Sequence, residues 1–406
     1  MYITLLSLIG KQGTNKPISI FSMKGAITSL TLCFLFLTVC SSLAAKNTSS
    51  YTRADIDQAY DAFNQQFLSP SLGIYYEKST QRGKVAAIWT QAIFADVAQN
   101  AYLRTRSEKD SLLFRTLLEG NRRYYDQYNW DNGKVWFIYD DIMWWVITLG
   151  RTYLITGETE WLRLSETGFE RVWSGSKVLK DNGSYDPVRG GMYWAWNQQH
   201  PEGSPTASMG KMACINYPTV IGAMTLFEAT GDSTYFKKGR EIYAWARANL
   251  FDKEAGRVAD SRHGSGNPAW KMHVYNQATC IGAAVMLYKA TGNKMYLNDA
   301  ILAADYTKAM SGNEFLHFEN GIEQGIYHAI FAQYIIRLIE DGGQRQYLPW
   351  LRANINAGWN NRLKNNNITY KDYANPAPGI EKIESYDASG IPALMQVIPP
   401  FKKSRK

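Results

Sequence analysis

The sequence contains little cysteine and little histidine, with four and five of its 406 residues respectively. Cys33 and Cys40 fall in an apolar N-terminal segment, and Cys214 and Cys280 fall in apolar helical stretches. A disulfide-rich scaffold is thereby excluded, and we expect the last two to be buried free thiols rather than a pair. The histidines lack the spacing of a zinc site, and no phosphate loop, dinucleotide motif or serine elbow is present. The sequence therefore predicts neither a metal nor a cofactor.

A charge excess is also missing from the body of the chain, although the formal net charge is +8. Lys11, Lys16 and Lys24 contribute +3, and the C-terminal stretch 402–406 contributes +4. What remains is 8 − 3 − 4 = +1, so a nucleic-acid partner has no electrostatic support. We interpret residues 401–406 as a solvated basic tail.

Long hydrophobic runs are confined to the N-terminus, where Gly25 to Val39 follows Lys24. This pattern is typical of an export signal and is short for a membrane span. We expect residues 1–44 to be that signal, with Met23 as the true start. Cleavage before Cys40, in a sequence that resembles a bacterial lipobox, would leave a lipid anchor there; ordinary cleavage near residues 42–45 is the alternative. The protein is expected to be periplasmic, secreted or anchored to the outer membrane, and to be a monomer.

What the chain has in abundance is a helical repeat marked by Thr-Gly pairs. The pairs end at Gly157, Gly231 and Gly292, and in each copy an aromatic residue follows four positions later. An almost wholly apolar helix precedes each glycine and an amphipathic helix follows it, so each copy predicts an inner and an outer helix joined at a glycine C-cap.

About twelve such helices predict an all-α fold, six hairpins closed into an (α/α)6 barrel over one domain at residues 50–400. A superhelical solenoid of the same hairpins is the alternative. Two long connections, 174–211 and 252–271, are expected to rim one end of the central funnel. The remaining helices are expected at residues 53–67, 84–101, 107–125, 158–173, 233–250, 322–340, 344–363 and 387–397.

Asp140 and Asp141 stand at the mouth of one of these apolar helices. Helix capping is the ordinary explanation for such residues. However, Trp144 and Trp145 follow within one helical turn, which predicts indole rings beneath the carboxyl groups and a floor that suits pyranose rings. Two adjacent carboxylates also repel, so one pKa is expected to rise while the other stays low.

That division of roles suits acid/base and nucleophilic catalysis on a glycosidic bond. Since neighbouring Cα atoms are about 3.8 Å apart, the two carboxyl groups hardly exceed the short separation, roughly 5–5.5 Å, of retaining enzymes. A double displacement through a covalent glycosyl-enzyme is therefore the expected mechanism.

The string from Tyr139 to Trp145 resembles the Asp-Asp-x-x-Trp-Trp motif of glycoside hydrolase family 76, the endo-α-1,6-mannanases. Further segments agree in order: 190–194, 275–277 and 287–292. The resemblance covers roughly residues 55–365. It implies an (α/α)6 fold, retention of configuration, no metal, Asp140 as nucleophile and Asp141 as acid/base. The chain departs from the family where Phe-Lys-Gly-Ile-Phe is usual, because it carries Tyr327-His328-Ala329-Ile330-Phe331, with Gln333 in place of an arginine.

Further candidates for sugar binding are aromatic residues near the funnel and polar residues at helix mouths or in the long loops. For each, core packing, a glycine turn, capping or an Asx turn is the competing explanation. Besides Trp144 and Trp145, they are Trp89, Trp136, Tyr193, Trp194, Trp196, Asn216, Tyr217, Asp260, Asn276, Gln277 and His328.

The sequence thus predicts an exported, retaining glycosidase that cleaves α-1,6-mannosidic linkages in mannan, with internal cleavage expected. One rival is an (α/α)6 carbohydrate-active enzyme of different linkage specificity. The other is a helical surface glycan-binding protein without catalysis, which has no need for paired acids at a buried mouth.

Overall fold

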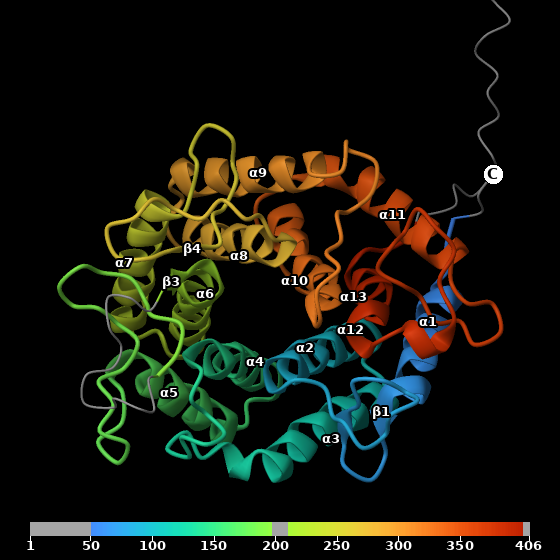
Figure 1. Cartoon of the computed structure of the whole chain (residues 1–406), viewed down its shortest axis with the longest axis horizontal. Helices are drawn as coiled ribbons and strands as arrows, with labels where there is room; N and C mark the ends of the chain where they lie inside the picture. Colours follow the sequence, from blue (N-terminus) through green and yellow to red (C-terminus); the bar gives the residue numbers. More distant parts are fainter. Residues whose placement is uncertain (1–49, 197–209, 401–406) are drawn as a thin grey trace, which may run out of the picture. The chain divides into compact units, whose positions relative to one another are not determined.

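The computed structural model describes residues 50–196 and 210–400. The expected export signal at 1–44 and the basic tail at 401–406 lie outside these ranges. The described part of the chain forms two concentric rings of helices (Figure 1). The inner ring consists of α2 (Ile88–Thr105), α4 (Tyr139–Thr156), α6 (Ala213–Thr230), α8 (Val274–Thr291), α10 (Tyr327–Glu340) and α13 (Gly390–Val397).

Each inner helix packs on the next, and α13 packs back on α2, so the ring is closed. The outer helices are α1 (Arg53–Phe67), α3 (Glu108–Tyr124), α5 (Thr159–Ser174), α7 (Ser233–Asn249), α9 (Lys294–Ala309) and α11 (Leu348–Asn360). The first five inner helices each continue into the outer helix that follows, whereas α13 packs against α1 from the other end of the sequence. This is the predicted (α/α)6 toroid, and its closure excludes the solenoid.

The repeat glycines act as predicted. Gly157, Gly231 and Gly292 adopt φ values of 74°, 72° and 67°, which favour glycine, and each N–H donates to the carbonyl group four residues earlier. The helices that they end, α4, α6 and α8, are buried over most of their length because both the ring and the outer helices cover them. Cys214 and Cys280 are buried free thiols, as expected.

Several helix boundaries differ from the expected ones. The helix expected at 84–101 begins only at Ile88, because Val85 bridges to Tyr76 in extended backbone. The helix expected from residue 322 begins at Tyr327, after Glu323 takes a left-handed conformation with φ 66°. The last expected helix is divided into α12 (Ser385–Ala388) and α13.

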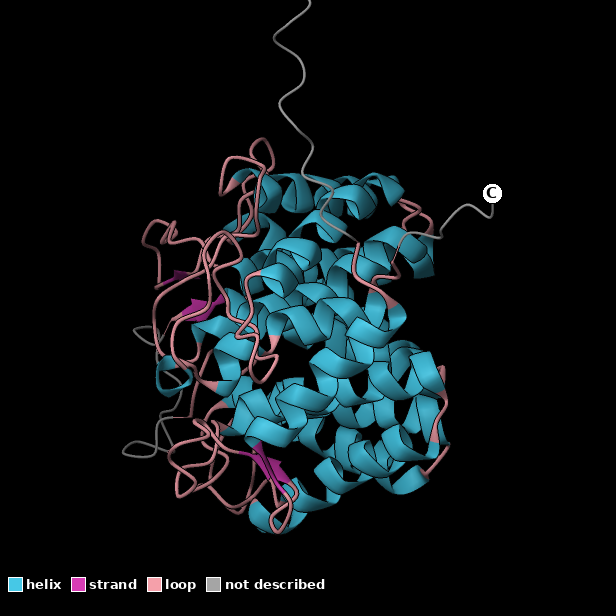
Figure 2. Cartoon of the chain, turned by 90° about the vertical axis from the view of Figure 1, so that its right-hand side faces the viewer, coloured by secondary structure: helices cyan, strands magenta, loops and turns pink. Residues whose placement is uncertain are grey.

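The longer loops gather at one end of the helical unit, together with both small sheets (Figure 2). One sheet pairs β1 (Leu68–Ser69) with β2 (Ile74–Tyr75), and the other pairs β3 (Lys211–Met212) with β4 (Ser261–Arg262), both antiparallel. Because β3 and β4 come from the two long connections, these loops are joined to each other at the end where the inner helices begin.

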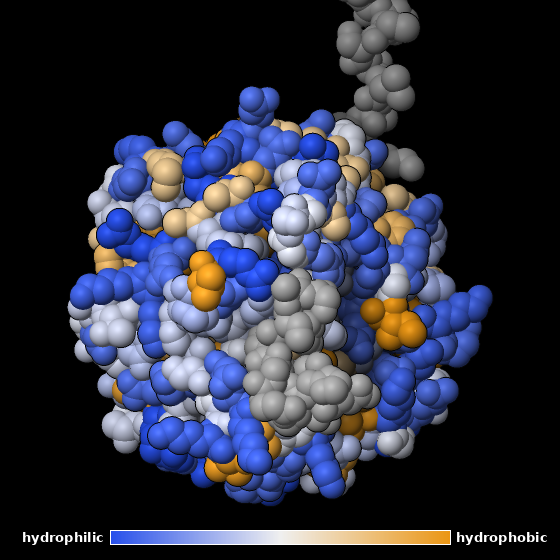
Figure 3. Space-filling view, turned by 60° about the vertical axis from the view of Figure 1, so that its left-hand side comes forward, coloured by the Kyte–Doolittle hydropathy of each residue, from blue (hydrophilic) through white to orange (hydrophobic). Residues whose placement is uncertain are grey.

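On the face seen in Figure 3, hydrophobic side chains are scattered among hydrophilic ones, as is usual for a protein surface. The described residues include no helix that is both long and apolar enough to cross a bilayer.

Candidate active site

The mouth of α4 is held by the loop that carries Trp194. The backbone N–H groups of Tyr139 and Asp140 donate to the Trp194 carbonyl, at 3.1 and 3.4 Å, and Ile138 bridges to Ala195. A loop backbone rather than a side chain therefore accepts from the first turn of α4. The Asp140 and Asp141 side chains are therefore not used to cap the helix.

A cleft of about 350 Å³ opens at this mouth. That volume falls within the range of about 300–1,000 Å³ typical of small-molecule sites. The beginnings of five inner helices, α2, α4, α6, α8 and α10, and the preceding loops line it, with Ala87, Ile88, Trp89, Ile138, Asp140, Asp141, Trp194, Met212, Cys214, Tyr275, Glu323 and Tyr327.

Asp140 and Asp141 both reach this cleft while remaining mostly buried, with 9% and 8% of their surface exposed. Asp140 Oδ1 has no hydrogen-bond partner among the described residues. Burial raises the pKa of Asp140 to about 7, and the nearby side chains of Cys214, Trp194 and Trp144 lower it by less. Near neutral pH the Asp140 carboxyl group is therefore present in both its protonated and its ionised form.

Asp141 has a different set of neighbours. Burial raises its pKa well above the usual value, and the negative charges of Asp140 and Glu323 raise it further. The expectation that one member of the pair keeps a low pKa is therefore wrong. Repulsion makes the pKa of Asp141 differ from that of Asp140. Burial, however, is the largest cause for both groups and raises both pKa values.

Glu323 is a third carboxyl group in the cleft, and the sequence reasoning missed it. It precedes the short 3-10 helix η3 (Gln324–Ile326), and its left-handed backbone turns it into the cleft. The Trp89 indole N–H donates to its Oε2 at 2.7 Å. A single glutamate between Ile322 and Gln324 carries no sequence signal that would have identified it.

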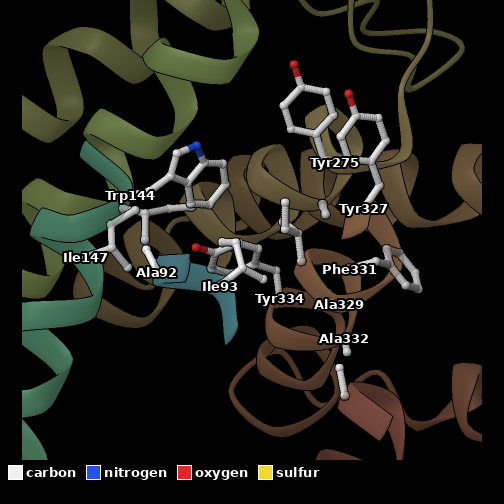
Figure 4. Packing of buried hydrophobic residues seen from close by; sticks show 14 of the residues in the cluster. Ala92, Ile93, Trp144, Ile147, Tyr275, Tyr327, Ala329, Phe331, Ala332 and Tyr334 are labelled. Atoms are coloured by element: carbon white, nitrogen blue, oxygen red, sulfur yellow. The ribbon is translucent and has the colours of Figure 1, made fainter. Parts of the chain in front are cut away.

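Aromatic rings form the walls and the floor of the cleft. Trp89 and Trp194 line it directly, as predicted, whereas Trp144 is buried beneath it with its ring 6.1 Å from that of Trp89. Tyr275 and Tyr327 stack at 4.1 Å on the opposite side. Figure 4 shows these two rings side by side with their hydroxyl groups pointing the same way, across from Trp144.

Three of the predicted aromatic contacts belong to the core instead. Trp145 and Trp136 are fully buried, and the Trp145 indole N–H donates to the Ile88 carbonyl at 3.0 Å. Tyr217 is also fully buried, against the Tyr243 ring. Fully buried side chains cannot reach the cleft, which corrects the expectation that these three contact sugar.

The polar residues at the other helix mouths hold loops in place. Asn216 bonds the backbone of Met192 in both directions, and Gln277 bonds the Val258 N–H and the carbonyl groups of Gly256 and Ala303. Both side chains are fully buried, so the expectation that they bind sugar hydroxyls is corrected.

Asn276 and Asp260 lie beside the cleft without lining it. The Asn276 amide donates to Asp260 Oδ1 at 3.4 Å, and the Asp260 carbonyl accepts from the Ala213 N–H at the start of α6. Burial is the largest cause that raises the pKa values of the cleft residues Cys214 and Tyr275, and the carboxyl groups of Asp140 and Asp260 raise them further.

Tyr193, Trp196 and His328 also lie away from the cleft. Tyr193 lines a separate pocket, and the Trp196 ring packs 5.9 Å from the Arg171 guanidinium. His328 is buried against the Tyr373 hydroxyl and the His317 carbonyl, both at 2.8 Å, and burial lowers its pKa to about 4. It is therefore a neutral core histidine and not a sugar ligand.

Of the departures from the family pattern, Tyr327 lines the cleft, whereas His328, Ala329 and Gln333 lie away from it. Ala329 is buried in α10, and Gln333 accepts from the Asn100 amide at 2.7 Å in a different cavity.

A closed (α/α)6 toroid with neighbouring acids in an aromatic cleft defines the class of the protein as a glycosidase. The model of glycosyl hydrolase family 76 matches residues 46–392. The chain belongs to this family.

Solved structures of this fold agree over most of the chain. An α-1,6-mannanase of family 76 from Salegentibacter sp. is 24% identical, with a TM-score of 0.72 over 84% of this chain and 98% of that one. An inactive variant of that enzyme, with two consecutive aspartates changed to asparagine, is in complex with α-1,6-mannotriose. A family 76 mannosidase from Bacteroides thetaiotaomicron is 17% identical, with a TM-score of 0.68 over 84% and 97%.

A more distant similarity is to Dfg5 from Chaetomium thermophilum in complex with glucosamine, which is 13% identical with a TM-score of 0.69 over 87% of this chain and 94% of that one. No curated protein matches the chain.

Proposed function

We propose that the protein hydrolyses α-1,6-mannosidic linkages within mannan with retention of configuration, through Asp140 as nucleophile and Asp141 as acid/base. One observation carries the proposal: two neighbouring carboxyl groups are mostly buried in an aromatic cleft and have no cation partner among the described residues. Burying such groups without compensation costs free energy, so their persistence indicates a use in chemistry.

The surroundings of the two groups support this order of roles. Asp140 has the side chains of Cys214, Trp194 and Trp144 nearby, which favour its carboxylate. Among the described residues, the charged groups that act on Asp141 are the acids Asp140 and Glu323, which favour its protonated form. As the pH rises, the first proton leaves mainly from Asp140, so the pair reaches the state that a nucleophile and an acid require together.

The reaction then proceeds in two displacements. The Asp140 carboxylate attacks the anomeric carbon while Asp141 gives its proton to the departing glycosidic oxygen, and the C–O bond breaks to leave a covalent glycosyl-enzyme. Water next gives a proton to the Asp141 carboxylate and attacks the same carbon, which releases Asp140. Two inversions give net retention.

The substrate is inferred from the family and from the cleft. The Salegentibacter enzyme of the same family is named an α-1,6-mannanase. The cleft of this chain offers indole rings, from Trp89 and Trp194, and the stacked phenol rings of Tyr275 and Tyr327 for sugar faces.

The test is incubation of the purified protein with linear α-1,6-mannan, followed by assay of new reducing ends. We expect release by the wild type and by the control Asp57→Asn, an exposed carboxylate on α1, but not by Asp140→Ala or Asp141→Ala. Proton NMR during hydrolysis is expected to detect the α-anomer first. Intact polymer that nevertheless binds would favour the glycan-binding rival, cleavage only of other mannans would favour a different linkage, and early β-anomer would contradict retention.

Export is also proposed, from the apolar run at residues 25–39. Mass spectrometry of the mature N-terminus tests it: an acylated Cys40 indicates a lipoprotein, a start near residues 43–46 indicates ordinary cleavage, and an uncleaved intracellular chain contradicts both.

A further inference from the structure

A second cavity, of about 130 Å³, lies behind one wall of the catalytic cleft. It is formed where α7 ends beside β3 and β4. Its side chains are Arg189, Tyr193, Lys211, Trp245, Asn249 and Arg262. None of them lines the cleft, and none has a role in the proposed reaction.

Two short segments, residues 193–194 and strand β3, separate this cavity from the cleft. In each, one residue lines the cavity and the next lines the cleft: Tyr193 is followed by Trp194, and Lys211 by Met212. In β3 this is expected, because successive side chains of a strand point to opposite faces. The two cavities therefore share a wall one chain thick, and a glycan that fills the cleft passes close to the second cavity.

The cavity carries an excess of positive charge. Lys211 Nζ lies 2.8 Å from Asp186 Oδ2, and Arg189 Nε lies 3.1 Å from the same oxygen. Arg262, in contrast, donates to the neutral Gly266 carbonyl and Asn249 amide oxygen. Three cations and the one carboxylate that they contact leave 3 − 1 = +2 among the described residues.

The position of two of these cations is unfavourable for the fold alone. Lys211 and Arg262 are directly paired across the β3–β4 sheet, so both point to the same face. Like charges at such positions destabilise a strand pair. Asp186 compensates Lys211, but Arg262 has no carboxylate partner among the described ion pairs, which indicates that an external anion completes the site.

The cavity also has an indole wall. Gly190 and Gly191 lie against the Trp245 ring so closely that a Cβ added at Gly191 would stand 2.5 Å from it. The Lys211 ammonium group lies 5.4 Å from the centre of the same ring. A half-buried indole that lines the cavity beside cations suits a sugar ring that carries an anionic group better than it suits a free ion.

We propose that this cavity binds an anionic substituent on a sugar, such as a phosphate, sulfate or carboxylate group, next to the catalytic cleft. That the sugar belongs to mannan depends on the proposed function, whereas binding of the anionic sugar itself does not.

The test is calorimetric titration of the full chain at low salt with mannose 6-phosphate, mannose and inorganic phosphate. Mannose 6-phosphate is expected to bind at least about tenfold more tightly than either of the others, since a hydrogen bond to a charged group contributes about 1.5–3 kcal/mol. Arg262→Gln and Arg189→Gln are expected to weaken this binding about tenfold, and Arg262→Lys by less.

Arg240→Gln, a surface change on α7 outside the cavity, is the matched control and is expected to bind as the wild type does. Thermal unfolding of each variant separates lost binding from lost folding. Equal binding of mannose and mannose 6-phosphate, or full binding by a folded Arg262→Gln, would overturn the proposal. Inorganic phosphate that binds as tightly as the sugar phosphate would overturn its sugar component. Because no turnover is measured, inactivity on mannan would leave this result unaffected.

Discussion

Asp96 and Asp141 are both buried carboxyl groups on inner helices, yet their surroundings differ. Asp96 in α2 lies 3.0 Å from the Arg151 guanidinium. Asp141, at the other end of α4 from Arg151, has two further acids beside it and no ion pair in the part of the chain that the structure describes. The charge of one buried carboxyl group is thus balanced at Asp96, whereas that of the other is left unbalanced at Asp141.

The same contrast holds beyond this pair. The other buried carboxyl groups of the described residues contact a cation or two hydroxyl groups: Glu77 with Lys84, Asp96 with Arg151, Asp181 with Arg171, Asp186 with Lys211, Asp299 with Arg247, Asp387 with Lys371, and Asp110 with Thr105 and Ser107. Unpaired burial, rather than burial alone, distinguishes the catalytic cleft.

The largest expected effect comes from Asp141→Asn. Loss of the general acid is expected to lower kcat by about 10²–10⁴-fold, with activity measured on linear α-1,6-mannan. The same change is expected to stabilise the fold above neutral pH. The folded-state pKa of Asp141 is raised, so its contribution to stability is present at low pH and is lost as the pH rises through that pKa.

Asparagine does not ionise, so the Asp141→Asn variant does not lose stability in this way as the pH rises. Thermal melts between pH 5 and pH 9 measure it, with the wild type losing stability more steeply than the variant. Parallel curves for the two proteins, or undiminished kcat, would contradict the role of Asp141.

The paired counterpart, Asp96→Asn, is expected to do the reverse. It leaves the Arg151 guanidinium buried without its carboxylate, at a cost of about 3–5 kcal/mol in the free energy of unfolding. The folded fraction is expected to keep its kcat, because Asp96 does not line the cleft. Urea unfolding measures the loss, and a double variant that also carries Arg151→Met is expected to recover part of it. A variant as stable as the wild type would remove the contrast between Asp96 and Asp141.

Glu323→Gln tests the third acid of the cleft. Removing its charge is expected to lower the pKa of Asp141, so the alkaline limb of the kcat profile shifts to lower pH by about one unit, which is about tenfold in rate on that limb. Glutamine can still accept from the Trp89 indole N–H through its amide oxygen, which keeps the geometry. Glu381→Gln, an exposed change, is the control. An unshifted limb would mean that the Glu323 charge does not reach Asp141.

The fold was predictable because its determinants are local. Apolar stretches that end at Thr-Gly, with an amphipathic helix after each, predict inner and outer helices whatever the loops do. The Asp pair and the cleft tryptophans Trp89 and Trp194 were also found. Closure by α1 against α13 was not foreseen in detail, since nothing local links residues more than 300 positions apart.

The remaining site residues depend on how loops approach one another. Glu323 reaches the cleft through a left-handed turn, and Tyr193 and Trp194 point to opposite sides of one wall. Helical spacing predicts that a side chain lies near the start of an inner helix. It does not predict whether that side chain is already hydrogen-bonded to the backbone of a loop. Asn216 and Gln277 were therefore expected at the sugar although they bind loops.

The smallest expected effects come from two tryptophans that the sequence alone does not distinguish. Trp194 is 38% exposed in the cleft, whereas Trp145 is fully buried and its indole N–H has a backbone partner. Trp194→Phe is expected to raise KM by a few-fold, about 1 kcal/mol of stacking, with Tm unchanged. Trp145→Phe is expected to leave KM unchanged but to lower the free energy of unfolding by about 1–3 kcal/mol, because the Ile88 carbonyl loses its donor and a gap remains. Steady-state kinetics and thermal melts on both variants separate the two effects. If Trp145→Phe changed KM without changing stability, Trp145 would contact the substrate and would not be a core residue.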